Sequence, residues 1–112
     1  MDVSIARLLD HYESVADGSS ALLRPDLLSM CQLHAVSESD FCDAFARALA
    51  LRYANGDLDA DGAAFAADDL HVAADFTLPP LARRVFDLLE YGEGSPADVR
   101  GLLDGLDRGT AP

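Results

Sequence analysis

The chain has 112 residues, enough for one domain that buries roughly two-thirds of the surface its unfolded form exposes. Apolar residues make up 50% of it, which excludes a disordered tail, and a net charge of −12, from 20 acidic and 8 basic residues, excludes the basic surface that direct nucleic-acid binding requires. No apolar segment reaches membrane-spanning length and no leader pattern follows the N-terminus, so we expect a single cytoplasmic domain over residues 1–112 without membrane contact.

The first half of the chain predicts three helices. Apolar residues at helical spacing indicate a helix over residues 2–16, which the turn-forming residues 17–20 end. A shorter helix follows from Pro25, because proline suits the first helical position. A third helix is predicted over residues 38–54, since Ser37 and Asp40 have capping-box spacing and Gly56 suits the left-handed position that ends a helix. Its length and lack of breakers indicate the central, most buried helix.

The second half predicts three more. A fourth helix is expected over residues 63–76 and, after two prolines, a fifth over residues 81–91. Ser95, Pro96 and Asp98 mark the start of a sixth helix that reaches Leu106, and residues 109–112 should fray. No window alternates as a strand does, and no repeat is present. The predicted fold class is therefore all-α, a compact bundle of about six short to medium helices.

An acidic stretch between the third and fourth predicted helices has the spacing of a calcium-binding loop. Aspartates occupy alternate positions, a glycine follows and a further aspartate closes the segment, in the pattern D-x-D-x-D-G-x5-D. A hard cation such as Ca²⁺ takes about six to eight oxygen ligands, and glycine at the sixth position permits a sharp turn. The candidate ligands are four carboxylates and one backbone carbonyl, those of Asp57, Asp59, Asp61, Asp68 and Ala63.

This segment resembles the calcium loops of the EF-hand family, and in particular the dockerin variant, whose loops also follow a glycine and end on Asp, as Gly56 and Asp68 do here. The resemblance covers residues 56–70 and implies calcium as the ligand. The chain has no second copy of the loop, and Ala64 and Phe65 replace the usual branched aliphatic residue and a side-chain ligand. Acids also gather at helix N-termini without metal, so Asp61 as a helix cap is the alternative.

Two cysteines, Cys31 and Cys42, are too few for a disulfide framework and predict a reduced pair. Cys31 and His34 share a helix face, but zinc needs further ligands, so we expect core cysteines in preference to a metal site. No cysteine, serine or histidine lies in a loop context that indicates an activated nucleophile, and no glycine-rich phosphate loop is present. We therefore expect no enzymatic activity and no cofactor.

The acidic excess allows three interpretations: solubility alone, attraction of a basic partner protein, or a salt-rich or GC-rich source. Small acidic helical proteins without catalytic residues resemble, as a class, bacterial immunity and antitoxin-type inhibitors. We expect a non-enzymatic interaction protein with a basic partner protein, with a single-site calcium protein as the alternative and a homodimer left open. The acids expected on the surface are Asp10, Glu13, Asp17, Asp40, Asp43, Asp68, Asp69, Asp75, Asp87, Glu90 and Glu93.

Overall fold

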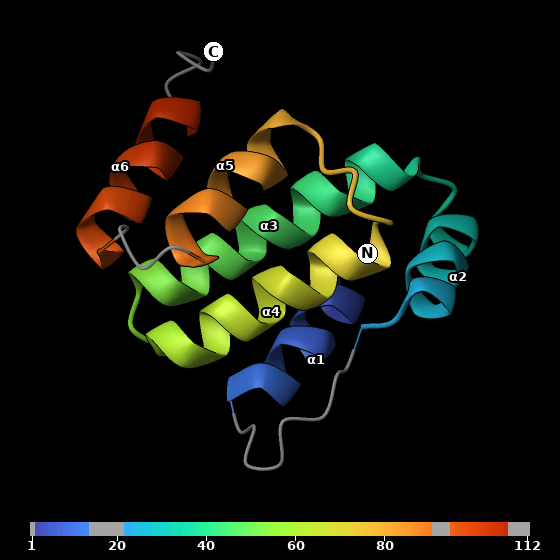
Figure 1. The fold of residues 1–112 in the computed structure, drawn as a ribbon, viewed down its shortest axis with the longest axis horizontal. Coiled ribbons are helices and arrows are strands. Elements are labelled where there is room, and N and C mark those ends of the chain that lie inside the picture. The colour runs from blue at the N-terminus through green and yellow to red at the C-terminus, as the bar shows by residue number, and fades with distance from the viewer. Residues whose placement is uncertain (1, 14–21, 91–94, 108–112) are drawn as a thin grey trace.

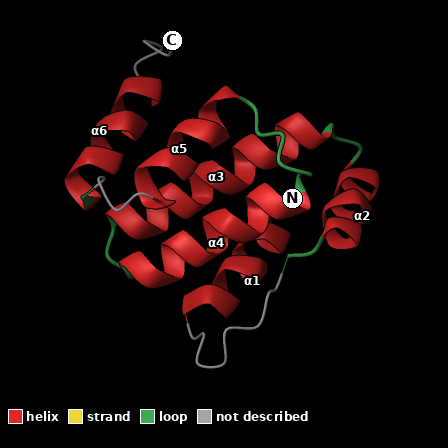
Figure 2. Cartoon of the chain, viewed as in Figure 1, coloured by secondary structure: helices red, strands yellow, loops and turns green. Residues whose placement is uncertain are grey.

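Six α-helices make up the described part of the chain, and no strand occurs in it (Figures 1 and 2). The computed structural model describes residues 2–13, 22–90 and 95–107. The predicted all-α class is confirmed. Residues 14–16 and 91 of the predicted helices, the predicted turn at 17–20 and the tail at 109–112 lie outside the described residues. The helices are α1 (Asp2–Glu13), α2 (Arg24–His34), α3 (Glu38–Ala54), α4 (Ala60–Ala73), α5 (Pro80–Glu90) and α6 (Pro96–Asp107).

Helix α3 lies at the centre and packs against each of the other five helices, while α2 and α6 lie at opposite edges of the molecule (Figure 1). Its start is fixed by Ser37, whose side chain accepts a hydrogen bond from the Asp40 N–H at 3.0 Å. Its end is fixed by Gly56, which has a φ of 82°. Both signals were visible in the sequence, and the predicted bounds and central place of this helix are confirmed.

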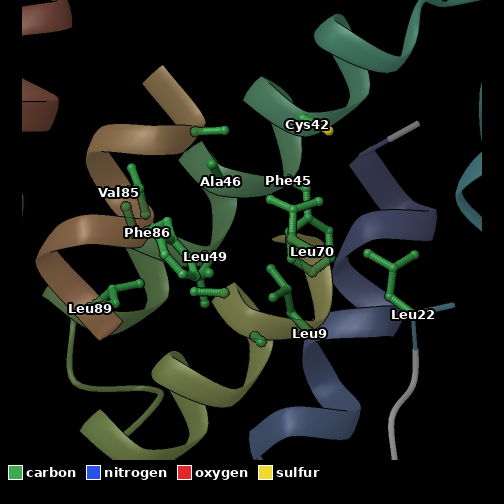
Figure 3. Close-up of a cluster of buried hydrophobic side chains, with 14 of the residues drawn as sticks. Leu9, Leu22, Cys42, Phe45, Ala46, Leu49, Leu70, Val85, Phe86 and Leu89 are labelled. Carbon is green, nitrogen blue, oxygen red and sulfur yellow. The ribbon is translucent and has the colours of Figure 1, made fainter. Parts of the chain in front are cut away.

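The hydrophobic core forms along α3. Phe45 and Leu49 point into the space between α1, α4 and α5, where Leu70 and Phe86 meet them (Figure 3). Phe41 continues this row, with its ring centroid 6.1 Å from that of Phe45. Each fully buried leucine or phenylalanine adds about 1.5–3 kcal/mol to the stability of the fold relative to an exposed one. The burial of this row is therefore a main source of the stability of the bundle.

Glycine at position 62 lets α4 approach α1 closely. A Cβ atom there would lie 3.0 Å from the Tyr12 carbonyl oxygen and 3.0 Å from Leu58 Cδ1. Gly62 is inside a helix, and among the described glycines the one with positive φ is Gly56. Gly62 is expected in a sharp turn, as the sixth residue of a calcium loop, but it lies within α4, where close packing against Tyr12 and Leu58 leaves no room for a side chain.

Helix α4 ends in a left-handed turn formed without glycine. Asp75 and Phe76 have φ angles of 57° and 61°. The Phe76 N–H donates to the His71 carbonyl at 2.9 Å and the Asp75 N–H to the Val72 carbonyl at 3.0 Å, the paired bonds of a Schellman motif. The helix therefore stops at Ala73, three residues before its predicted end. The prediction missed this because no glycine marks the turn: Asp75 tolerates the left-handed region, whereas Phe76 rarely adopts it.

Candidate interaction surface

The predicted calcium-loop residues lie in and just before α4. Asp59 is the N-cap, and its Oδ1 accepts a hydrogen bond from the Gly62 N–H at 2.7 Å. The cap predicted at Asp61 is therefore two residues too late, and the helix starts at Ala60 instead of Ala63. The prediction chose Asp61 because a glycine follows it directly. An N-cap side chain instead accepts from the backbone N–H two or three residues further along, and the Gly62 N–H has that position relative to Asp59.

The helix separates the proposed ligands. Asp61 and Asp68 are seven residues apart in α4, which is about 10 Å along the helix axis, whereas oxygens on one calcium ion lie about 2.3–2.6 Å from it. The structure does not bring Asp57, Asp59, Asp61, Ala63 and Asp68 around one point. Across the described residues, no three His, Cys, Asp or Glu side chains are grouped so that they could hold a metal ion. Calcium binding stays the alternative hypothesis, and it would require the first turns of α4 to unwind.

Both cysteines are free and buried. Burial raises the pKa of the Cys42 thiol to about 12, with a further contribution from Cys31. Cys42 lines a hollow of about 290 Å³ between the start of α3 and the α4–α5 connection, and no histidine lines that hollow. His34 instead contacts the Ser4 hydroxyl, with 3.5 Å between Nε2 and Oγ. A thiol with so high a pKa is protonated at neutral pH and is a weak nucleophile.

One acid predicted on the surface is in the core. Asp69 is 7% exposed, and its Oδ2 accepts a hydrogen bond of 2.6 Å from the Tyr12 hydroxyl. That hydroxyl also accepts from the Leu22 N–H at 3.2 Å. A buried carboxylate needs such partners, because leaving it unpaired costs several kcal/mol. The surface prediction for Asp69 is wrong, and Tyr12, a long-range partner, is the reason. Asp17 and Glu93 and the side chain of Glu90 lie outside the described residues.

The outward face of α4 is acidic. Asp61, Asp68 and Val72 lie at helical spacing on the side of α4 that faces away from the core, and all three are exposed. The sequence between Arg52 and Arg83 has no arginine and no lysine, although it contains six aspartates. Five of these are exposed, and among the described residues none of the five is in an ion pair: Asp57, Asp59, Asp61, Asp68 and Asp75.

Four of the eight arginines bind groups other than the exposed aspartates of α4. Arg52 pairs with Asp10 and Glu13 of α1, and Arg83 pairs with Asp87 one turn along α5 at 3.2 Å. Arg24 pairs with Glu38 at 3.2 Å and donates to the Ala73 carbonyl at 2.8 Å. Arg100 donates to the Asn55 side chain. None of these four guanidinium groups is in an ion pair with an exposed aspartate on or beside α4, so the negative charge on the α4 face is not neutralised by them.

A second surface feature lies along α3. An open hollow of about 530 Å³ is lined by Ala44, Arg47, Ala48 and Leu51 together with Asp43 and Leu81. A smaller one of about 160 Å³ shares Ala44, Ala48 and Leu51 and reaches α1. The two hollows share this α3 surface, one toward α5 and the other toward α1, and their linings are mostly small or apolar side chains. Neither hollow is lined by a histidine, cysteine or serine, so this surface offers no nucleophile–base pair.

No protein-family model, curated protein or solved structure matches this chain. Helices long and apolar enough to cross a bilayer are not found among the residues described here. The candidate interaction surface therefore depends on charge, exposure and geometry alone. The sequence analysis missed two of its features: the gap between Arg52 and Arg83, which the sequence does display, and the exposure of Val72 and Phe76, which depends on where α4 ends.

Proposed function

We propose that this chain is a non-enzymatic interaction protein that binds a basic partner protein through the outward face of α4. The observation that carries the proposal is the run of exposed aspartates on and beside α4, none in an ion pair among the described residues, with no arginine or lysine between Arg52 and Arg83. Like charges held on one face attract a complementary surface and speed its encounter, and they also discriminate against acidic partners.

A toxin-inhibiting protein, of the immunity or antitoxin type, is the specific form of this proposal. A nucleic-acid-acting toxin needs a basic surface for phosphates, and an acidic face can cover such a surface. The proposal places the chain in the cytoplasm, where its two free thiols, Cys31 and Cys42, are kept reduced. The chain shares three properties with small inhibitors of this class: its small size, its helical fold and its net charge of −12. These shared properties support this form of the proposal.

The test is retention of native host proteins on the immobilised chain, with two variants of equal charge. Asp61→Asn with Asp68→Asn removes two carboxylates from the α4 face, and Asp40→Asn with Asp104→Asn removes two exposed ones from α3 and α6. We expect basic proteins to be retained at about 0.05 M salt and released at about 0.5 M, where the Debye length falls well below 10 Å. The α4 variant should lose them and the control variant should keep them. Equal retention by both variants, or no basic protein at low salt, would overturn the proposal.

A further inference from the structure

An exposed aromatic side chain stands at the C-terminal end of the acidic face. Phe76 is 64% exposed and Val72, in the last turn of α4, is 50% exposed. Isolated exposed apolar side chains are common on protein surfaces and carry no meaning alone. These two differ because they lie four residues apart at the end of α4, in a segment that also carries the exposed Asp68 and Asp75.

The Phe76 ring is held in place. It packs edge-on against the His71 ring at 5.2 Å, and His71 in turn packs on Phe86 at 4.4 Å, which belongs to the hydrophobic core. The backbone is fixed as well, because the Phe76 N–H donates to the His71 carbonyl. A pre-positioned aromatic ring loses little conformational entropy when a partner covers it, and for that reason such rings serve as anchors in interfaces.

Two exposed carboxylates near this end of α4 are in no ion pair among the described residues. Asp68 lies one helical turn before Val72, and Asp75 directly precedes Phe76; both are exposed. Arg24 lines the same hollow as Asp75, but its guanidinium already donates to Glu38 and to the Ala73 carbonyl. The end of α4 thus carries two exposed apolar side chains and two exposed carboxylates within nine residues, 68–76.

We infer that this end of α4 is the docking point for a segment of a partner protein in which arginine side chains flank an apolar residue. The apolar residue covers Phe76 and Val72, and the arginines pair with Asp68 and Asp75 while their planar groups stack on the phenylalanine ring. The charge complementarity selects this occupant: an acidic or purely apolar segment would leave both carboxylates desolvated without a partner. The inference rests on the proposed function and names the point of contact within it.

The test uses peptides as probes and the full chain, labelled with ¹⁵N, as the reporter. One peptide repeats Arg-Leu-Arg-Ala and a second, of equal charge, repeats Arg-Ala-Arg-Ala. We expect the first to bind more tightly and to shift the backbone amide resonances of residues 68–76. Phe76→Ser should weaken its binding about tenfold or more, whereas Leu33→Ser, at a side chain 74% exposed on α2, should leave it unchanged.

Further variants separate anchoring from folding and charge. Val72→Ser removes apolar surface without touching the turn at Phe76 and should also weaken binding, while circular dichroism reports whether each variant folds. Asp68→Asn should weaken binding several-fold and reduce its salt dependence, and Asp104→Asn on α6 should do neither. Equal binding of both peptides, or full binding by Phe76→Ser and Val72→Ser, would overturn the inference and leave the proposed function standing. Failure of every basic peptide to bind at low salt would overturn both.

Discussion

Tyr12 is the residue on which three distant parts of the chain depend. Its hydroxyl donates to Asp69 of α4 at 2.6 Å and accepts from the Leu22 N–H at 3.2 Å. Its ring packs edge-on against Phe65, with 5.6 Å between centroids. A single side chain therefore satisfies a buried carboxylate and a buried backbone donor while it fills space between α1 and α4.

Tyr12→Phe should lower the free energy of unfolding by about 1–3 kcal/mol, because the ring stays but Asp69 and the Leu22 N–H each lose a buried partner. Urea unfolding followed by circular dichroism measures this change. Tyr53→Phe is the control for loss of a phenol hydroxyl elsewhere. If Tyr12→Phe matched the wild type, the hydrogen bonds at Asp69 would carry no net stability.

Asp43 links α3 to α5, and its titration makes the free energy of unfolding depend on pH. Its Oδ1 accepts a hydrogen bond from the Ala82 N–H at 3.2 Å, near the start of α5. Burial raises the pKa of this carboxyl above its usual value, and the hydrogen bond only partly opposes that shift. A folded-state pKa above the unfolded one means that the folded state binds more protons, so this group's contribution to stability falls as pH rises through its titration range.

Asp43→Asn should therefore be at least as stable as the wild type at pH 7, because an amide oxygen still accepts from Ala82 without a buried charge. The difference should shrink as the pH falls through the titration range of the carboxyl, where wild-type Asp43 is protonated. Thermal midpoints at several pH values measure it. Asp40→Asn, one turn away and exposed, controls for the change in net charge. A loss of stability at pH 7 confined to Asp43→Asn would show that the hydrogen bond needs the charge.

At the scale of the helices, two glycines in helical positions have opposite roles. A Cβ on Gly62 of α4 would meet the Tyr12 carbonyl and Leu58, whereas a Cβ on Gly101 of α6 would have nothing within 4 Å. Alanine favours an open helix interior by about 0.5–1 kcal/mol over glycine. Where backbone stands in the way, that gain is outweighed by strain.

Gly62→Ala should thus destabilise the protein by about 1 kcal/mol or more, and Gly101→Ala should stabilise it by about 0.5–1 kcal/mol. Chemical denaturation of the two variants beside the wild type gives both values, and each variant serves as the other's control. Stabilisation by Gly62→Ala would mean that α1 and α4 can separate by a few tenths of an ångström at little cost.

Calcium tests the other interpretation of the α4 start. With Asp61, Ala63 and Asp68 held in the helix, we expect millimolar calcium to leave the thermal midpoint of chelator-treated protein unchanged, with magnesium as the control. Binding at a hundred times the dissociation constant would add about 2.7 kcal/mol, which is roughly ten degrees for a chain of this size. A calcium-selective rise of that order, abolished by Asp57→Ala with Asp61→Ala, would instead establish the loop as a metal site.

The helices differ in how well the sequence predicts their ends. Ser37, Gly56 and the Ser95–Asp98 pair are local signals, and the bounds of α3 and the start of α6 follow from them. The ends of α4 are harder to predict. Its start is set by a local bond from the Gly62 N–H to Asp59, but Asp57, Asp59 and Asp61 alternate there and the sequence does not show which of them is the cap. Its end is set by two left-handed residues that are not glycine. The burial of Asp69 likewise follows from Tyr12, which is 57 residues away.

At the scale of the whole molecule, the main feature is the excess of acidic over basic side chains. The net charge of −12 is spread over a body about 34 × 32 × 24 Å, so carboxylates on different helices lie within one or two Debye lengths of each other at low salt. Folding brings these charges closer together than they are in the unfolded chain. Mutual repulsion between carboxylates therefore opposes folding. This repulsion persists on the α4 face, because no guanidinium group of the described residues forms an ion pair with its carboxylates.

Raising sodium chloride from about 0.02 M to about 0.5 M should therefore increase the thermal midpoint by several degrees, because screening weakens the repulsion more in the folded state than in the unfolded one. The double variant Asp61→Asn with Asp68→Asn brings the net charge of −12 two units closer to zero and should show a higher midpoint at low salt and a smaller salt effect. Sodium sulfate at equal ionic strength separates this screening from the general salting-out effect. A midpoint that fell with salt would show that the ion pairs of Arg52 and Arg24 stabilise the fold more than the carboxylate repulsion destabilises it. In that case a basic partner would gain no affinity by relieving repulsion on the acidic face.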